Sequence, residues 1–214
     1  MLFRSLVYLA LKEFDGDYKM SDLASTTQRD IRAHYRSLSQ ARLLATKLLF
    51  AVGSLDSISL ACRSSTVGKL TPSALYVHID AVEHLPAVLK VYEGCARRLI
   101  GDVPGANLIK LHRDTKKISY LAYPDFDSDP HPSLHQSDIV DLVEQRLERR
   151  RYPQNGNVPI LHRKETFLHR SDPRWERFAH ATLAEEEAGL YVETSAIGYR
   201  DQWRSLLKSK GLLN

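Results

Sequence analysis

The chain has 214 residues, of which 43% are hydrophobic and 26% charged, and it carries a formal net charge of +4. This is the composition of an ordinary globular chain with enough apolar material for a core, in one sizeable domain or two small ones. Two cysteines, Cys62 and Cys95, are too few for a disulfide framework and suit a reducing compartment. No apolar run approaches the roughly 20 residues that span a bilayer, so we expect no membrane partner, and the sparse cysteines favour a cytoplasmic location.

The first third of the sequence predicts a small helical bundle. Ser25 and Gln28 have the spacing of a capping box, in which both side chains bond to free backbone N–H groups at a helix start. Gly53 is placed to end a helix in the left-handed conformation that glycine adopts readily. Apolar residues recur at helical spacing over residues 2–14, 25–36, 38–52 and 56–63.

The middle of the chain predicts strands and one long helix. Glycine and proline near residues 67–72 mark a boundary. We therefore divide the chain into a helical part, residues 1–66, and an α+β part, residues 67–214. Short apolar runs predict strands at 74–78, 108–112 and 117–122, the last two joined as a hairpin, and a helix is expected from Pro86 to Gly101.

The remainder mixes irregular segments with helices. Residues 123–132 cannot form regular structure because three prolines and three alternating aspartates interrupt them. Residues 138–152 are ambiguous, since their Glu, Gln and Arg content favours a helix whereas their paired aliphatic residues permit two strands. Helices are expected from near Pro173 to Gly189 and over 199–208. The predicted fold is α+β, with an N-terminal helical bundle, a small, mostly antiparallel central sheet and C-terminal helices.

Three polar clusters around the short apolar runs supply the candidate site. If the runs before 110–113 and 162–165 are strands, both basic clusters emerge at the edge of one small sheet, where arginine forks suit phosphate oxygens and tyrosines can stack on bases. The alternative is a salt-bridged polar network that only stabilises the fold. The candidates for binding nucleic acid or another ligand are Lys110, His112, Arg113, Asp125, Asp127, His131, His162, Arg163, Lys164 and Glu165.

The aspartate-rich cluster has only some features of a metal site. Asp125, Asp127, Asp129 and His131 alternate and so share one side of an extended segment, which suits a divalent cation. The run lacks the glycine and distant glutamate of a calcium loop, and zinc-ligand spacing is missing from the chain. In a metal-dependent nuclease a lysine follows the second acidic residue at short spacing, whereas here Lys164 precedes Glu165. We therefore expect no bound metal, and turn capping is the simpler role for the aspartates.

No motif names a reaction. The sequence contains no Gly-x-Ser-x-Gly elbow, no Gly-x-Gly-x-x-Gly and no Walker loop, so neither a nucleophile nor a nucleotide cradle can be assigned. The catalytic residues are accordingly unknown, and no cofactor is expected in this chain.

Several motifs, taken together and in order, carry a family resemblance. They resemble the C-terminal region of the bacterial DNA phosphorothioation-associated methyltransferases, a family named for an expected activity. On this resemblance, and against helix propensity, we predict a strand pair over 138–152. The motifs include 119–127 (SYLAYPDFD) and 159–167 (PILHRKETF), with others at 67–70, 74–78, 91–97, 109–113 and 129–132 and shorter matches at 6–11, 28–31 and 196–200.

The resemblance implies an intracellular bacterial protein that acts beside the machinery that places sulfur in the DNA backbone. The S-adenosylmethionine-binding domain of that family lies N-terminal to the matched region and is missing here, so methyl-transfer activity cannot be carried over. The expected function is an accessory region that binds DNA or a partner from the modification machinery. Two other hypotheses stay open: a structural or dimerising domain, and a metal-dependent, nuclease-like enzyme that uses Asp125, Asp127, His131, His162 and Glu165.

Overall fold

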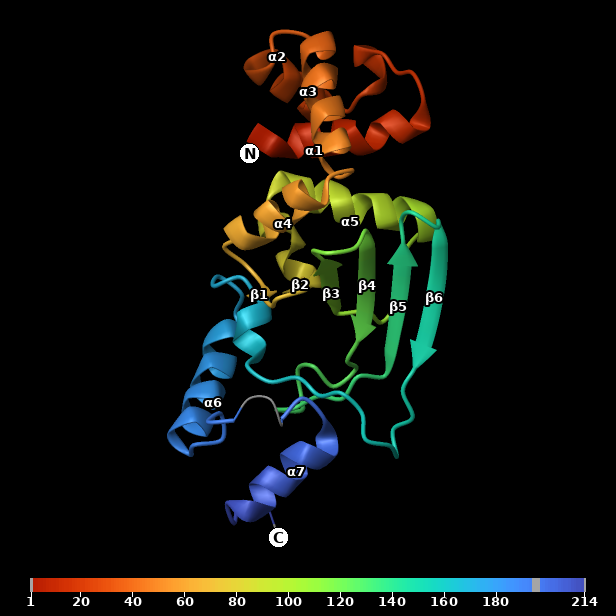
Figure 1. Ribbon diagram of the computed structural model, residues 1–214. Helices are drawn as coiled ribbons and strands as arrows, with labels where there is room; N and C mark the ends of the chain where they lie inside the picture. The colour runs from red at the N-terminus through yellow and green to blue at the C-terminus, as the bar shows by residue number, and fades with distance from the viewer. Residues whose placement is uncertain (1, 194–196, 214) are drawn as a thin grey trace.

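The architecture is α+β, as the sequence predicts, with an antiparallel sheet between two groups of helices (Figure 1). The computed structural model describes residues 2–193 and 197–213. The sheet contains β1 (Lys69–Leu70), β2 (Ala74–His78), β3 (Leu108–His112), β4 (Lys117–Ala122), β5 (Gln136–Asp141) and β6 (Arg146–Arg151), which are neighbours in chain order. The helices are α1 (Leu2–Lys12), α2 (Ser25–His34), α3 (Leu38–Ala51), α4 (Leu55–Ser64), α5 (Ala87–Ile100), α6 (Trp175–Glu187) and α7 (Arg200–Ser209). Short 3-10 helices are η1 (Glu13–Asp15), η2 (Met20–Asp22), η3 (Ile79–His84) and η4 (Lys164–Phe167).

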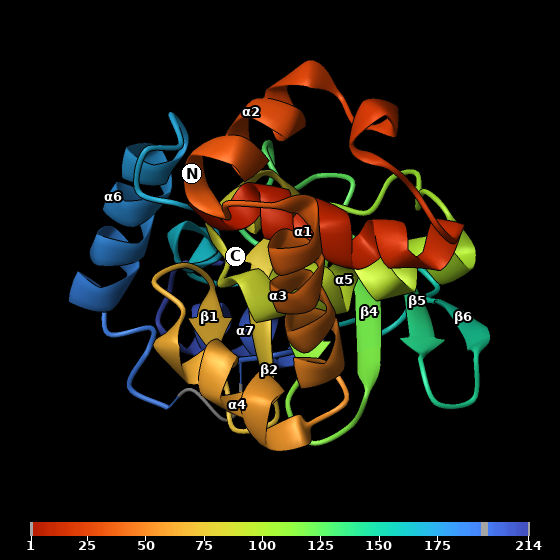
Figure 2. The ribbon, with the colours of Figure 1, turned by 90° about the horizontal axis from the view of Figure 1, so that it is seen from above.

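The N-terminal helices and α5 form a layer on the sheet. Figures 1 and 2 show α5 next to the strands, with α1 and α3 above it and α4 alongside. One apolar cluster joins these helices to the sheet and includes Leu9, Ile31, Ile58, Tyr92 and Ile118. Because this cluster contains residues from both sides of position 66, the two parts share a core, and their division into separate domains stays a prediction.

The inner face of the sheet, toward α5, is apolar because strand residues alternate between the two faces. Val77 pairs with Ile109, and Ile118 pairs with Val140, and all four side chains are fully buried in the main cluster. This alternation turns the intervening residues of each strand to the outer face, where the polar candidates on β3 lie.

One carboxylate is buried between α5 and the sheet, and it is paired. Glu93 is 7% exposed and accepts hydrogen bonds from the Tyr120 hydroxyl at 3.1 Å and from Arg97 Nε at 2.6 Å. Burying an unpaired carboxylate costs several kcal/mol, so the two donors make this position tolerable. The network also fixes α5 against β4.

The C-terminal half of the chain covers part of the outer face. Leu108 and Leu121, which point outward, pack with Phe126, Phe167 and Phe178 in a second apolar cluster. α6 and η4 lie beside β1 and β2 in Figure 1, and α7 lies beyond the opposite end of the strands from α1. A third cluster of Ile160, Leu190, Ile197 and Trp203 holds α7 in place.

Residues 138–152 form β5 and β6, as the family resemblance predicted, rather than the helix that their composition favours. β5 pairs with β4 on one side and with β6 on the other. Asp138 on β5 is 1% exposed, and its carboxylate accepts hydrogen bonds from Arg149 Nε and from a second nitrogen of the same guanidinium, each at 2.8 Å. Sheet pairing and this forked ion pair outweigh the weak intrinsic preference of the RLERRR segment.

Two predicted helix-end signals are wrong. α2 begins at Ser25, but its N-cap is Ala24, and Gln28 Nε2 donates to the Leu23 carbonyl oxygen at 2.9 Å rather than completing a capping box. Gly53 does not adopt a positive φ. The next helix starts immediately, with Ser54 as its N-cap, so the chain turns without a left-handed residue.

Among the described residues, no single helix combines the length and apolar composition needed to cross a membrane. α3 and α4 meet that test only when taken together, and a bend of 96° separates them.

Tyr92 ties α5 to the β3–β4 hairpin, which generates a test of the packing. Its buried hydroxyl lies 2.8 Å from the Lys117 carbonyl oxygen and 3.1 Å from that of Thr115. Tyr92→Phe keeps the ring and removes this donor, so we expect the free energy of unfolding in urea to fall by about 1–2 kcal/mol. Tyr8→Phe, at an exposed position of α1, is the matched control. Equal losses in the two variants would contradict the role of Tyr92.

Candidate functional site

Lys69 on β1, Tyr76 on β2 and Lys110 on β3 lie side by side on the outer face, and we call them the outer-face row. The register pairs Tyr76 with Lys69 on one side and with Lys110 on the other. Lys110 Nζ lies 5.4 Å from the centre of the Tyr76 ring, and Lys69 Nζ lies 5.7 Å from the centre of the Phe167 ring. Neither ammonium group has a hydrogen bond or an ion pair to another described residue.

A cavity of about 340 Å³ lies beside the outer-face row, and we call it the row pocket. Lys69 and Tyr76 form one wall, and His162, Arg163 and Tyr191 contribute to others. The extended segment before His162 is held by two isolated bridges, one between residues 133 and 160 and one between residues 159 and 199. The row pocket therefore joins strands near the middle of the chain to segments near its C-terminal end.

The backbone of Arg163 changes direction between the pocket and η4. Its φ of 54° and ψ of 55° lie in the left-handed region, which costs a residue with a side chain about 1 kcal/mol or more. Thr166 holds this conformation, because its N–H and its hydroxyl both donate to the Arg163 carbonyl oxygen, at 3.0 and 2.6 Å. The guanidinium stacks 4.4 Å from the Tyr191 ring centre and pairs with Glu186 at 2.7 Å.

His162 contributes a neutral ring to the row pocket. Its Nε2 lies 2.6 Å from the Ile197 carbonyl oxygen, so Nε2 carries the proton and donates, while Nδ1 is buried without a hydrogen-bond partner among the described residues. Burial, and then the neighbouring His131, lower the pKa of His162 to about 4. The ring of His131 lies 4.7 Å away, and its Nε2 is 2.8 Å from a Glu185 carboxylate oxygen. At neutral pH the His162 ring is thus uncharged, and its unpaired Nδ1 is shielded from solvent.

The cations around the pocket are incompletely neutralised. Burial lowers the pKa of Lys69, and the positive charge of Arg163 lowers it further, while Glu165 acts in the opposite direction. Arg163 is already paired with Glu186, so a bound anion mainly offsets the unpaired charge of Lys69. The arrangement suits a phosphate oxygen better than a neutral group.

Lys164 and Glu165, although predicted as site residues, are engaged in the core. Lys164 Nζ donates to the carbonyl oxygens of Phe126 at 2.7 Å and Asp129 at 2.6 Å. Glu165 accepts a hydrogen bond from the Thr182 hydroxyl at 2.8 Å, and burial raises its pKa. Both side chains bind η4 to its neighbours, so the predicted four-residue cluster 162–165 is divided between the pocket and the core.

Arg113 likewise has a structural position. Its guanidinium binds the Ser59 hydroxyl at 3.0 Å and the Thr71 carbonyl oxygen at 2.9 Å, which ties the β3–β4 hairpin to α4 and to the turn after β1. His112 lies on the outer face two residues from Lys110, with Nε2 3.0 Å from the Ser119 hydroxyl. Burial lowers the pKa of His112 to about 4.

The aspartates of the 123–132 loop are spread over different contacts. Asp125 is exposed, and Asp127 pairs with Arg174 at 3.3 Å. Asp129 Oδ1 accepts from the backbone N–H of His131 at 2.8 Å, which is the turn-capping role. Within residues 2–193 and 197–213, no group of three or more His, Cys, Asp or Glu side chains is arranged to hold a metal ion.

Three residues of this site were not among the sequence candidates. Lys69 sits in a segment that was interpreted as a boundary and as one of the resemblance motifs, and Tyr191 follows α6 at a distance of nearly thirty residues from Arg163. Tyr76 and Lys110 lie on two predicted strands. Because side chains alternate between the two faces of a strand, this alternation was the signal that could have placed both residues on the same face.

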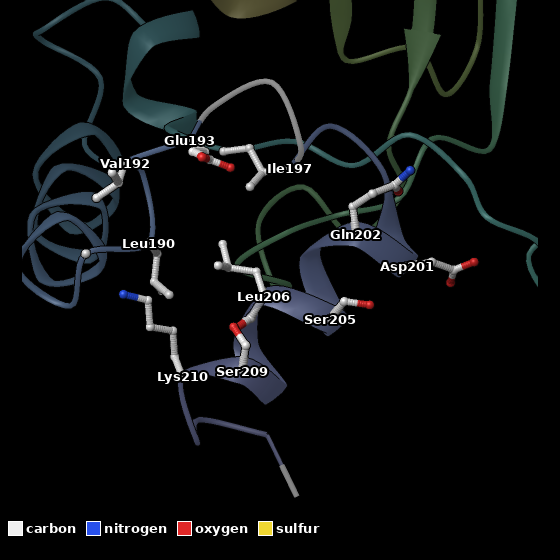
Figure 3. A pocket seen from close by; sticks show the side chains of 11 residues that line it. Leu190, Val192, Glu193, Ile197, Asp201, Gln202, Ser205, Leu206, Ser209 and Lys210 are labelled. Carbon is white, nitrogen blue, oxygen red and sulfur yellow. The ribbon is translucent and has the colours of Figure 1, made fainter.

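A larger hollow, of about 660 Å³, lies between the end of α6 and α7. In Figure 3, Leu190, Leu206 and Lys210 lie close together, whereas Asp201 and Ser205 point away from them. Its walls include residues on both sides of positions 194–196, which lie outside the described residues. The side chains drawn do not converge on a common point, and we assign no function to this hollow.

Comparison of the chain with protein-family models, with curated proteins and with solved structures gives no match. The argument for function therefore starts from the outer-face row and the row pocket.

The core position of Lys164 predicts a loss of stability on substitution. Lys164→Met keeps the aliphatic stem near the Phe178 ring but leaves two carbonyl oxygens without their donor. We expect the free energy of unfolding to fall by about 2–4 kcal/mol in urea denaturation. Lys47→Met, at an exposed position of α3, is the control and should change it by less than about 0.5 kcal/mol. A Lys164→Met protein as stable as the control would show that the ammonium is not an anchor.

The lowered pKa of His162 predicts a dependence of stability on pH. The unfolded chain, with a histidine pKa near 6.5, binds a proton before the folded chain, whose His162 has a pKa of about 4. Stability that is present above pH 6.5 is therefore lost between pH 6.5 and 4, by up to about 1.4 kcal/mol per pH unit. In His162→Gln, which keeps an N–H for Ile197, we expect a shallower loss when unfolding is measured across this range. His34→Gln, at an exposed position, should follow the unmodified protein, and parallel curves for all three would refute the assignment.

Proposed function

We propose that this chain is a DNA-binding accessory module and that the outer-face row makes the contact. The observation that carries the proposal is the position of two ammonium groups on either side of one tyrosine ring, neither of them paired with a carboxylate of the described residues. Grooves that bind nucleic-acid strands combine cations for the phosphates with aromatic rings for the bases. The outer-face row offers both within three neighbouring strands.

The positive surface continues toward the other edge of the sheet. Lys117, Asp141 and Arg146 are successive cross-strand neighbours on β4, β5 and β6. Lys117 and Asp141 pair at 3.0 Å, which leaves the exposed Arg146 as the net charge of this group. Because neighbouring strands are about 4.8 Å apart, the distance from β1 to β6 is roughly 24 Å. That length matches about seven nucleotides of one strand at 3.4 Å each.

The resemblance described above gives the module its proposed setting. Under this proposal it acts in the bacterial cytoplasm beside the DNA phosphorothioation machinery. It would position DNA, or a protein of that machinery, for a methyl-transferring domain that uses S-adenosylmethionine and lies outside this chain. The support from the molecule itself is the charged outer face.

The test is DNA binding across a salt titration with the double variant Lys69→Gln/Lys110→Gln. Each lost phosphate contact lowers the slope of log K against log salt by about 1, so we expect the slope to fall by up to about 2. Affinity at low salt should fall at least about fivefold, measured by fluorescence anisotropy on a duplex and on a single strand, each with and without phosphorothioate linkages.

Lys47→Gln/Lys208→Gln is the matched control, since it removes the same charge from exposed positions of α3 and α7. It should leave the slope almost unchanged. If both double variants weaken binding equally, the effect is one of net charge and the outer-face row is not the contact. If the unmodified chain binds none of these DNAs at low salt, the proposed function is wrong.

A further inference from the structure

We infer that the row pocket takes one nucleotide unit of an unpaired strand, with its base inside the pocket and its phosphate at Lys69 and Arg163. This inference rests on the proposed function and names the ligand of the same surface. It depends on three features of the pocket: the nature of its walls, the neutral ring of His162 and the cations beside it.

The walls of the row pocket suit a planar ring. Tyr76, Phe167 and Tyr191 all line the cavity, and the Tyr76 and Phe167 rings pack edge to face with centres 6.5 Å apart. A cavity of about 340 Å³ lies within the usual size of small-ligand sites. Aromatic side chains stack on any nucleobase because every base has a flat π face.

His162 contributes a neutral ring to the pocket wall. His162 is 7% exposed and lines the row pocket, and its Nε2 is committed to the Ile197 carbonyl oxygen. Its Nδ1 is shielded from solvent, so the ring meets a ligand by van der Waals contact and not through a hydrogen bond. A flat nucleobase gains from contact with such a ring, whereas inorganic phosphate does not.

The cations place the phosphate. Lys69 and Arg163 both line the cavity, and the ammonium of Lys69 has no partner among the described residues. Lys69 also belongs to the outer-face row, so a strand lying along the sheet reaches the pocket at this residue. A base that leaves the strand here enters the pocket while its phosphate stays with the two cations.

Tryptophan fluorescence gives a direct measurement. The chain has two tryptophans, and the Trp203 ring lies 4.5 Å from the His162 ring, so the full-length Trp175→Phe protein reports on the neighbourhood of the pocket. It would be titrated with nucleoside 5′-monophosphates, with the matching nucleosides and with inorganic phosphate. We expect saturable binding of the monophosphates with a roughly millimolar Kd, and binding at least about tenfold weaker for nucleoside or phosphate alone.

Two variants in the same background test the geometry. Lys69→Gln removes the unpaired ammonium beside the pocket, so the monophosphate Kd should rise about fivefold or more. Gly198→Leu adds bulk to the pocket wall at a residue where a Cβ would meet nothing within 4 Å, and it should abolish binding without unfolding the protein. Circular dichroism and urea denaturation establish that each variant is folded.

The outcomes separate this inference from the proposed function. Salt-dependent DNA binding without any monophosphate binding would overturn the nucleotide pocket and leave the outer-face row in place. Equal binding of phosphate and monophosphate would also overturn it, because the site would then be an anion site only. Unchanged monophosphate affinity in both folded variants would do the same. Monophosphate binding that both variants weaken supports the pocket. An unmodified chain that binds no DNA would instead refute the proposed function.

Discussion

Burial of one face of the sheet against α5 is the constraint on which the rest of the molecule depends. Val77, Ile109, Ile118 and Val140 lose contact with water there, and each fully buried aliphatic side chain contributes on the order of 1.5–3 kcal/mol. A shift of one residue in the register of any strand would turn such side chains to the opposite face. The same constraint therefore fixes which polar residues reach the outer face and in what order.

The second organising feature is the change of direction at Arg163. Up to His162 the chain is extended and lines the row pocket, and after Arg163 it coils into η4 and enters the core. Four adjacent polar residues thereby acquire two different roles, with His162 and Arg163 at the pocket and the next two as anchors. The cost of a left-handed arginine is offset by the two hydrogen bonds from Thr166 to its carbonyl oxygen.

The sequence predicts well those parts of the fold in which local and tertiary preferences agree. β3 and β4 follow from apolar runs on either side of a short polar turn, and α5 from its helical spacing and closing glycine. β6 could not be predicted from propensity, because RLERRR is a good helical sequence that becomes a strand only through pairing with β5 and the Arg149–Asp138 contact. The strand prediction there came from the family resemblance.

The candidate site was harder to predict for a physical reason. From the sequence alone we treat adjacent residues as one cluster. In the fold, a sharp backbone turn separates neighbours in the chain, and strand pairing brings together residues that are far apart in the sequence. Lys69 meets Arg163 across more than ninety residues of chain. Lys164, a candidate for ligand binding, instead satisfies two buried carbonyl oxygens, and only the completed packing distinguishes these two uses.

β6 lies at the edge of the sheet and is exposed along its length. Its free backbone groups could pair with the same strand of a second copy, which is how many sheets extend into aggregates. The arginines of β6 point to both faces in alternation, so such pairing would bring like charges opposite one another on each side. The arginines that make this edge positive thus also disfavour its pairing with the same edge of another copy.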